Sequence, residues 1–285
     1  MIALGAPALF IFLWSSGFII AKYGVPYVDP MLFLVARFAG AALLLGGLAV
    51  AKGVPWPRDP RELRNTAIIG ILMHGVYLGG VWAAIAHGMS SGVTAMIVSL
   101  QPILTGLLAG PLLGERMTYR QWIGMALGLA GAIMVLSVKV GTPGGDWIAI
   151  SLAVLGLAGV TGGTLLQKRW AGATDIRVGN AVQYAASALA LTPFVIFGTP
   201  WVVPSWELAA VYFWATVLMS YVAINLFYGL IRKGEASRVS SLMYLVPPTT
   251  AVMAWVLFDE RLTQVSAAGI VLAAIGVALV TGGKR

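Results

Sequence analysis

The sequence contains no cysteine and only two histidines, His74 and His87. The lack of cysteine excludes disulfide bonds and cysteine-ligated metals or clusters. Charge is scarce as well, because only 10% of the 285 residues are Asp, Glu, Lys or Arg, whereas 59% are hydrophobic. So few charges cannot solvate the surface of a soluble globular protein. The chain is therefore expected to lie in a lipid bilayer, which agrees with its mean hydropathy of +0.90.

Further absences argue against two classes of membrane protein. An intramembrane enzyme needs a nucleophile and a base, an acid pair or metal ligands, and the chain has no G-x-S-x-G motif and no acid pair within an apolar run. A channel needs a filter motif or a charged ring, and neither is recognisable. We therefore disfavour both classes and expect no catalytic residue, metal, cofactor or nucleic-acid partner.

Long apolar runs dominate what is present. A membrane-spanning helix needs about 20 mostly apolar residues, and the bilayer interior admits only helices or closed barrels. Runs of this length exclude the barrel. The first run lacks a positively charged start and a small-residue cleavage pattern, so it is interpreted as a spanning helix rather than a signal peptide. The ten predicted helices are 3–22, 30–51, 66–86, 92–113, 120–138, 147–167, 178–198, 207–230, 238–258 and 264–282.

The basic residues predict the orientation of these helices. Of the 18 Lys and Arg residues, 14 lie in the even-numbered loops and at the C-terminus, and Arg37 lies within the second helix. Only Lys22, Lys139 and Arg261 lie in odd-numbered loops. Because cytoplasmic loops carry the excess of Lys and Arg, both termini are predicted to be cytoplasmic.

Two segments, 94–136 and 239–281, match in register at a spacing of 145 residues. Five predicted helices separate the copies, and because five is odd the second copy crosses the bilayer in the opposite sense. Inverted repeats are typical of transporters with a substrate site where the halves meet. The matched pairs are Pro102 with Pro247, Glu115-Arg116 with Glu260-Arg261, Thr118 with Thr263, Gly124 with Gly269 and Gly131 with Gly276. A weaker echo at a spacing of 146 pairs Lys22 with Lys168, Asp29 with Asp175, Arg37 with Gln183 and Phe38 with Tyr184.

This duplicated pattern of a proline in the fourth helix, Glu-Arg-x-Thr and a glycine-rich fifth helix resembles the drug/metabolite transporter superfamily. The likeness is to its EamA-type ten-helix exporters, in particular bacterial aromatic amino-acid exporters of the YddG type, and covers essentially the whole chain. It implies an all-α protein of the bacterial inner membrane, with ten transmembrane helices as two inverted five-helix repeats around a central cavity. The expected repeats are residues 1–139 and 146–285.

Polar and aromatic residues fall on one face of several predicted helices. In the eighth helix, Trp214, Tyr221, Asn225 and Tyr228 follow one stripe at an α-helical period. Polar groups in hydrocarbon are costly unless they are paired or hydrated, so these faces are expected to point inward. Each residue also has a structural explanation, such as bonding to its own helix. The substrate-binding candidates are Trp14, Ser15, His74, Tyr77, Gln101, Thr161, Tyr221, Asn225, Tyr228, Ser240 and Tyr244.

The repeated motifs have structural interpretations too. Pro102, Pro247 and Pro248 are hinge candidates, because a proline inside a helix frees a carbonyl and bends the axis. Thr118 with Gln121 has the form of a helix-capping box, and Thr263 is expected to cap the tenth helix similarly. The alternative is that Glu115 and Glu260 form gate salt bridges. Glycines 124, 128 and 131 predict close helix packing.

Charge inside the predicted helices is almost absent. No Asp or Glu lies at mid-membrane, and the first helix reads FLWSSGF where small multidrug exporters of the superfamily carry a glutamate. Uniport and proton-coupled antiport through His74 both stay open. Arg37 lies roughly 12 Å along the second helix from Asp29, at a cost of about 2.5–3.5 kcal/mol if unpaired. It either binds a substrate carboxylate or has a structural role. The sequence favours the structural role.

The sequence thus predicts an exporter of small metabolites that works by alternating access. A cavity of aromatic, hydroxyl and amide groups with little fixed charge suits an aromatic or other neutral amino acid, and the amino-acid part rests on the resemblance. Another metabolite, a nucleotide sugar or a lipophilic drug is the alternative cargo. The expected partners are this small-molecule substrate and the lipid bilayer.

Overall fold

A computed structural model describes residues 2–113, 118–139, 147–170, 174–224, 226, 245–260 and 263–281. These residues form helices and loops, and the β-pairing among them is one bridge between Val28 and Val202. The predicted all-α class is thereby confirmed. The helices are α1 (Ile2–Gly24), α2 (Pro30–Ala51), α3 (Pro60–Gly70), η1 (Ile71–Val76), α4 (Tyr77–Ala86), α5 (Ser91–Val98), α6 (Gln101–Leu113), α7 (Tyr119–Lys139), α8 (Trp147–Trp170), α9 (Ile176–Ile196), α10 (Trp206–Phe213), η2 (Trp214–Ala223), α13 (Val246–Phe258) and α14 (Gln264–Thr281).

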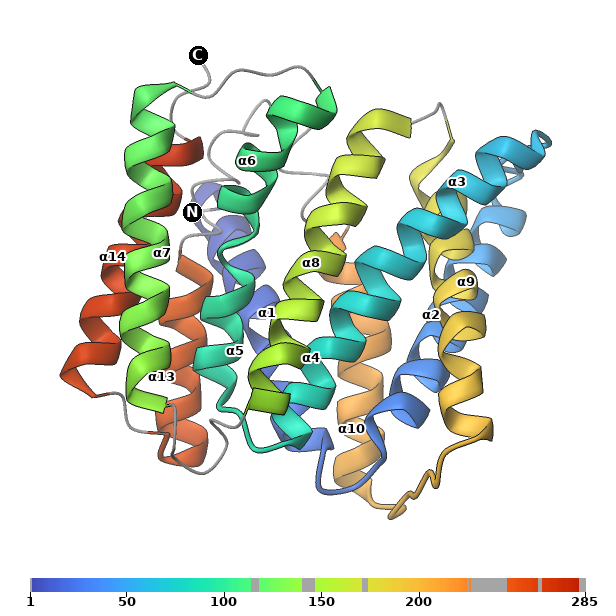
Figure 1. The fold of residues 1–285 in the computed structure, drawn as a ribbon. Coiled ribbons are helices and arrows are strands. Elements are labelled where there is room, and N and C mark those ends of the chain that lie inside the picture. The colour runs from blue at the N-terminus through green and yellow to red at the C-terminus, as the bar shows by residue number, and fades with distance from the viewer. Residues whose placement is uncertain are drawn as a thin grey trace.

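The helices form a bundle with one tight helix pair at each edge (Figure 1). α7 packs along α14 at one edge, and α2 packs along α9 at the other. The remaining helices lie between these pairs, with α1 contacting both α13 and α5. Each of the ten predicted spans overlaps helix within the described residues.

The surface of the bundle is apolar. Leu43, Leu189 and Phe197 are among many large hydrophobic side chains that are more than 70% exposed, as expected for residues that face lipid. Six described helical stretches are long and apolar enough to cross a membrane. They are Gly5–Gly24, Pro30–Ala51, Pro60–Ala86, Ser91–Leu108, Trp147–Trp170 and Trp206–Ala223.

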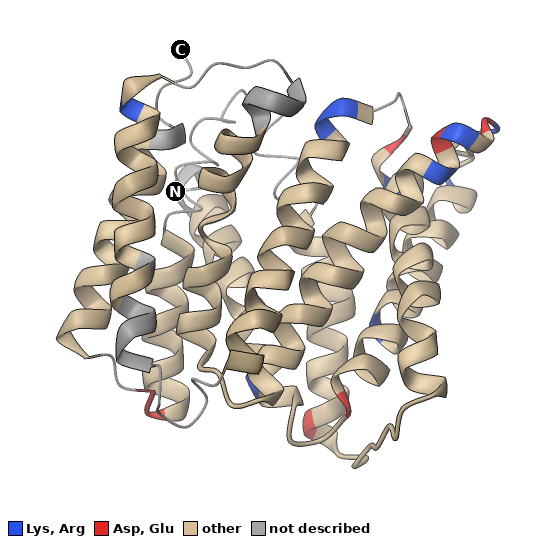
Figure 2. Ribbon diagram, viewed as in Figure 1, with Lys and Arg blue, Asp and Glu red and all other residues tan. Residues whose placement is uncertain are grey.

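Charged residues lie mostly at the helix ends (Figure 2). Lys and Arg gather at the upper ends of α3 and α8 in this view, and the acidic residues at the lower ends of the bundle include those that follow α13. The ribbon between is almost free of charge, which matches the apolar thickness that a bilayer requires.

The two halves begin several helices in the same way. Asp29 caps α2 by accepting from the backbone N–H groups of Met31 and Leu32 at 3.0 and 2.9 Å, and Asp175 caps α9 by accepting from Arg177 N–H at 2.9 Å. These aspartates are 146 residues apart. An N-cap oxygen satisfies a helix N–H that has no partner within the helix, so the echo at this spacing has a structural cause.

The expected caps of α7 and α14 are also present. Thr118 N–H donates to the Gln121 Oε1 at 2.7 Å, and the Gln121 N–H donates to the Thr118 hydroxyl at 3.4 Å. This reciprocal pair is the predicted capping box. In the second half, Ser266 N–H donates to the Thr263 hydroxyl at 3.1 Å. The repeated threonine therefore serves the scaffold.

Close helix contacts recur in the two halves. A Cβ on Gly131 would lie 2.5 Å from the Gly269 carbonyl oxygen, and a Cβ on Gly276 would lie 2.5 Å from that of Gly124. Each glycine therefore lets the backbones of α7 and α14 approach where a side chain would collide. This reciprocal contact confirms the close packing predicted from small residues.

Three predicted spans differ in detail from the structure. The span at 66–86 begins earlier, at Pro60, and passes through the π-helical segment η1. The span at 92–113 is two helices, because α5 ends at Val98 and α6 begins at Gln101. The span at 207–230 includes a second π-helical segment, η2. Hydropathy is uniform across these stretches, so it does not reveal the changes of backbone hydrogen bonding.

Candidate transport site

In each half, the helix that contains the repeated proline begins at an equivalent position. α6 begins at Gln101 and α13 at Val246, which are 145 residues apart, and each is 13 residues long. Pro102, Pro247 and Pro248 lie in these first turns, where a proline removes no helical hydrogen bond. For Pro102 the expectation of a position inside a continuous helix is therefore wrong, whereas the residues that precede Leu245 and bear on Pro247 and Pro248 lie outside the described residues. Their hinge role stays a prediction.

Beside the start of α13, α1 makes two polar contacts across the boundary between the halves. Ser15 is fully buried, and its hydroxyl donates to the Val246 carbonyl oxygen at 3.4 Å. The Thr250 hydroxyl donates to the Ser15 carbonyl oxygen at 3.3 Å. These bonds hold the middle of α1 against the first turns of α13.

The contact between α6 and α8, which corresponds to that between α13 and α1, is made by different residues. Gln101 Nε2 donates to the Thr164 hydroxyl at 2.8 Å. Thr161 is buried, but its hydroxyl donates to the Leu157 carbonyl oxygen of its own helix at 2.7 Å. The Thr105 hydroxyl is shielded from solvent and has no hydrogen-bond partner among the described residues. The structure thus brings Gln101 to α8 and leaves one buried hydroxyl unsatisfied.

α1 also contacts the second half through η2. Trp214 Nε1 donates to the Ser16 hydroxyl at 2.8 Å, and that hydroxyl donates to the Leu13 carbonyl oxygen at 2.7 Å. Trp14 is half-buried, with its ring centroid 5.4 Å from that of Phe10. This side of α1 therefore combines aromatic rings with satisfied hydroxyls.

The third span carries His74 and Tyr77 where its backbone changes type. His74 lies in η1, and Tyr77 is the first residue of α4. Both are partly buried, and His74 Nε2 is shielded from solvent without a hydrogen-bond partner among the described residues. π-helical turns are rare and are frequently found at functional sites.

A cluster forms around His74 where η1 meets α2 and α9. The Tyr184 ring lies 4.4 Å from the His74 ring and 5.8 Å from the Phe38 ring, in centroid distances. Arg37 is only 6% exposed, and its Nε has no hydrogen-bond partner among the described residues. Gln183 lies beside His74 and donates to Gln167 Oε1 at 3.2 Å.

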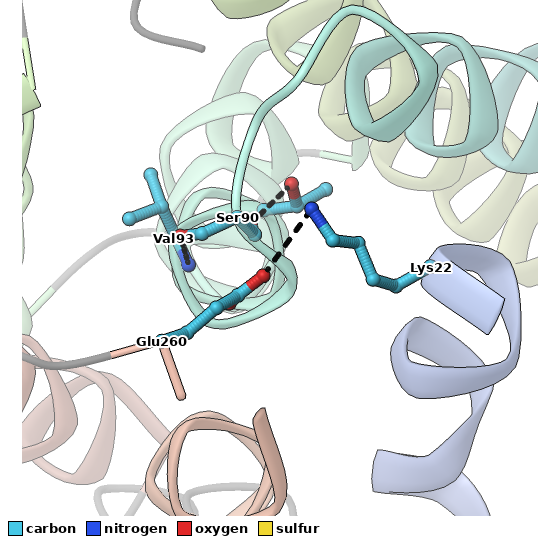
Figure 3. A network of polar contacts seen from close by, with 5 residues as sticks. Lys22, Ser90, Val93 and Glu260 are labelled. Carbon is cyan, nitrogen blue, oxygen red and sulfur yellow. Dashed lines mark hydrogen bonds and ion pairs between the residues drawn. The ribbon is translucent and has the colours of Figure 1, made fainter. Parts of the chain in front are cut away.

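One end of the contact between the halves carries an ion pair. Lys22, near the end of α1, lies 3.6 Å from Glu260, which follows α13 (Figure 3). Ser90, the N-cap of α5, lies beside them and accepts from Val93 N–H at 3.3 Å. A carboxylate at the start of a helix is stabilised by the helix dipole. Nearby, the Tyr23 and Phe258 rings lie 5.2 Å apart.

The remaining candidates are placed in part. Tyr221 is half-buried in η2 and packs against the core cluster that contains Trp82. The stripe predicted through Trp214 and Tyr221 assumed an α-helical period, which η2 does not have, so that argument for a shared face is wrong. Asn225, Tyr228, Ser240 and Tyr244 lie outside the described residues.

Sequence reasoning did not select three residues that the structure places at these contacts. Thr250 bonds α1, and Gln183 and Tyr184 complete the cluster around His74. The repeat spacing could have found them, because Thr250 corresponds to Thr105, while Gln183 and Tyr184 correspond to Arg37 and Phe38.

An all-helical bundle with lipid-facing surfaces and polar contacts between two similar halves is the architecture of a multi-pass membrane transporter. Comparison with known sequences identifies the family of transporters. The sequence profile of the EamA-like transporter family matches residues 2–137 and again residues 147–282. The chain belongs to the EamA-like transporter family, within the drug/metabolite transporter superfamily.

Relatives span nearly the whole chain. The uncharacterized inner membrane transporter YedA of Escherichia coli K12 is 28% identical over 283 residues, covering 97% of this chain and 89% of its own. A probable terminal-alkyne amino-acid exporter of Streptantibioticus cattleyicolor is 26% identical, with 99% and 95% covered. A probable amino-acid metabolite efflux pump of Salmonella typhimurium is 24% identical, with 97% and 94% covered.

The fold also has a counterpart among solved structures. One crystal structure superposes with a TM-score of 0.65 at 19% sequence identity, covering 96% of this chain and 95% of that one. The family and the names of these relatives describe transporters, and the name of YedA places that relative in the inner membrane. The chain is thus a multi-pass inner-membrane transporter.

Proposed function

We propose that this protein exports small neutral metabolites, amino acids in particular, from the bacterial cytoplasm by alternating access. Its two halves are inverted repeats, residues 1–139 and 146–285, around a central cavity, with both termini cytoplasmic. The observation that carries the mechanism is that the Thr250 hydroxyl bonds α1, whereas its counterpart, the Thr105 hydroxyl, has no hydrogen-bond partner among the described residues.

The unequal contacts involve two pairs of hydroxyl residues. By the repeat spacings, Ser15 corresponds to Thr161, and Thr250 corresponds to Thr105. The Thr250 hydroxyl bonds Ser15 of α1, whereas the Thr105 hydroxyl has no partner in the described part of the chain and Thr161 bonds its own helix. An unsatisfied buried hydroxyl is costly. A rearrangement in which the Thr105 hydroxyl bonds α8 and the Thr250 hydroxyl leaves α1 would remove this cost on one side and create it on the other.

Reciprocal packing between the halves supports their inverted relation. A Cβ on Gly17 would contact the Met219 side chain, and a Cβ on Gly163 would contact the Met73 side chain. These pairs are related by the spacing of 146 residues in both members. Each half therefore inserts a methionine from its third helix against a glycine of the other half's first helix, as a two-fold arrangement requires.

The ion pair supports closure of the molecule on one side. Lys22 and Glu260 join the ends of the two helices that the Ser15 and Thr250 bonds hold together. The excess of basic residues in the opposite loops assigns the Lys22 end to the outer side. The described conformation is then closed toward the outside. The sequence counterparts on the other side are Lys168 and Glu115, of which Glu115 lies outside the described residues.

The cargo is inferred from the groups between the halves and from relatives. Trp14, Tyr77 and Tyr221 are half-buried aromatic residues, and Gln101 supplies an amide. Aromatic walls with few charges favour a small zwitterion over a polyanion such as a nucleotide sugar. Two relatives are named as probable amino-acid exporters or efflux pumps, which supports the same cargo class.

Transport by purified protein in liposomes tests this proposal. We expect labelled phenylalanine, leucine and threonine to cross faster than in protein-free liposomes, and a labelled nucleotide sugar not to. Failure with every amino acid would remove the cargo assignment. An imposed pH gradient at equal substrate gradients then separates the coupling modes, because uniport predicts an unchanged initial rate and proton antiport predicts an increased one.

A further inference from the structure

We propose that Arg37, His74 and Tyr77 form a carboxylate-binding site where α2, η1, α4 and α9 meet. The proposal deepens the proposed function, on which it rests for naming the carboxylate as that of an amino-acid cargo. It differs from the sequence-based preference for a structural Arg37, because the guanidinium has the Phe38 ring as a neighbour but its Nε has no hydrogen-bond partner among the described residues.

Arg37 makes a cation–π contact, with its guanidinium carbon 5.9 Å from the centroid of the Phe38 ring, but its Nε lacks the hydrogen bond that would hold a structural arginine. Its side chain lies within α2, a helix that spans the apolar thickness, and only 6% of the residue is exposed. Its Nε is buried without a hydrogen-bond partner, and among the described residues no acid forms an ion pair with it. A snorkelling arginine would instead be exposed at a helix end, and a helix tie would bond a carbonyl.

The absence of a partner is informative because of its cost. An arginine at the centre of a spanning helix costs about 2.5–3.5 kcal/mol on the insertion scale. Ionisable residues in this position normally pair with each other or lie on a substrate pathway. The guanidinium is a fixed fork of N–H donors that matches a carboxylate in geometry and charge. A ligand carboxylate would therefore complete the site.

His74 provides the second unsatisfied group of the same cluster. Its Nε2 is buried without a hydrogen-bond partner among the residues that the structure describes, and its ring is held 4.4 Å from the Tyr184 ring and 6.1 Å from the Phe38 ring. The aromatic neighbours therefore fix the ring while leaving one nitrogen unused. In the tautomer with a proton on Nε2, this nitrogen donates a hydrogen bond to an anion.

The repeat explains why the site takes one negative charge. Arg37 corresponds to Gln183, and Phe38 corresponds to Tyr184, and these two pairs meet where α2 packs along α9. Phe38 and Tyr184 stack with ring planes 23° apart. At position 183 the second half supplies a neutral amide instead of a second arginine. One arginine with neutral donors around it suits one carboxylate and not a diphosphate.

The cluster borders the third span, which carries His74 and Tyr77. Arg37 is buried, whereas His74 and Tyr77 are only partly buried. Arg37 lies within electrostatic reach of Tyr77, Tyr184 and His74. Tyr77 also packs against the core cluster shared with Trp14 and Tyr221. A ligand that reaches Arg37 past His74 and Tyr77 would thus leave its apolar part beside these aromatic side chains.

Binding of three small probes to purified protein tests the site. Phenylalanine carries an amine and a carboxylate, phenylacetate carries the carboxylate alone, and phenethylamine carries the amine alone. We expect Arg37→Gln to weaken phenylalanine and phenylacetate about 10- to 100-fold, as loss of a charged hydrogen bond predicts, with phenethylamine unchanged. Arg37→Lys should restore part of the loss. Arg58→Gln, in an exposed loop, is the matched control and should bind as the wild type does.

The results separate this site from the proposed function. Unchanged binding of both carboxylates by Arg37→Gln, or no binding of either by the wild type, overturns the site. Arg37-dependent binding of phenylacetate without amino-acid transport keeps the site and removes the cargo. Should Arg37→Gln not fold, as judged by thermal unfolding, His74→Phe keeps the ring and removes the unused nitrogen. The His74→Phe variant should then bind phenylacetate more weakly than the wild type does. Binding equal to that of the wild type overturns the site.

Discussion

At the scale of single residues, the unsatisfied groups carry the functional information. Most buried hydroxyls of the described helices bond a carbonyl of their own or a neighbouring helix, as Ser16, Thr161 and Ser187 do. The hydroxyls of Ser91, Thr105 and Thr216 do not, and Arg37 Nε and His74 Nε2 also lack a hydrogen-bond partner among the described residues. Because buried polar groups in native proteins are nearly always satisfied, such exceptions indicate either a second conformation or a bound ligand.

A residue-scale prediction concerns the aromatic candidates. Tyr77→Ala and Tyr221→Ala each remove a half-buried ring near the boundary between the halves, so each should shift the ratio of phenylalanine to threonine transport by about tenfold, the usual range for a lost apolar contact. Competition assays in liposomes measure this ratio. Tyr119→Ala, which removes an 81% exposed side chain on α7, is the control. Normal rates and ratios in both variants would exclude these tyrosines from the site.

At the scale of helices, apolar composition and the repeat predicted most of the fold, including the caps at Thr118 and Thr263. The break before Gln101 and the π-helical segments were missed, because both are changes of backbone hydrogen bonding within equally apolar sequence. Site candidates were predictable as polar groups in apolar runs. Their pairing was not, because Gln101 with Thr164 depends on how distant helices approach.

A helix-scale prediction concerns the α7–α14 contact. Gly131→Val places a branched side chain against the Gly269 carbonyl, so we expect the free energy of unfolding to fall by about 1–3 kcal/mol, the cost of overpacking. Gly47→Val makes the same change in α2, where a Cβ meets nothing within 4 Å, and serves as the control. Denaturant unfolding in detergent gives both values. Equal stability of the two variants contradicts the predicted close contact.

At the scale of the whole molecule, the halves are alike in fold and unlike in contact. The chain has no cysteine, so paired cysteines can be introduced without background. Ser15→Cys with Thr250→Cys should form a disulfide readily and abolish transport, because it locks the contact that the structure shows. Thr105→Cys with Thr161→Cys should crosslink more slowly, and faster in the presence of substrate. Gel mobility and transport before and after reduction measure both.

The crosslinking result also decides the mechanism. Full transport activity in the oxidised Ser15 and Thr250 double variant would show that α1 and α13 need not separate. Recovery of transport on reduction is the required sign that the loss came from the crosslink and not from the substitutions.

The π-helical segments allow two spans to change in length and in rotation. A turn closed by bonds from residue i to i+5 holds more residues than an α-helical turn, so η1 and η2 are shorter than α-helices of the same number of residues. Conversion of either to α-helix would lengthen its span and rotate every side chain beyond it. Tyr77 follows η1 directly. Movement of the π-helical turn along the third span would thus rotate the Tyr77 ring without breaking the helix.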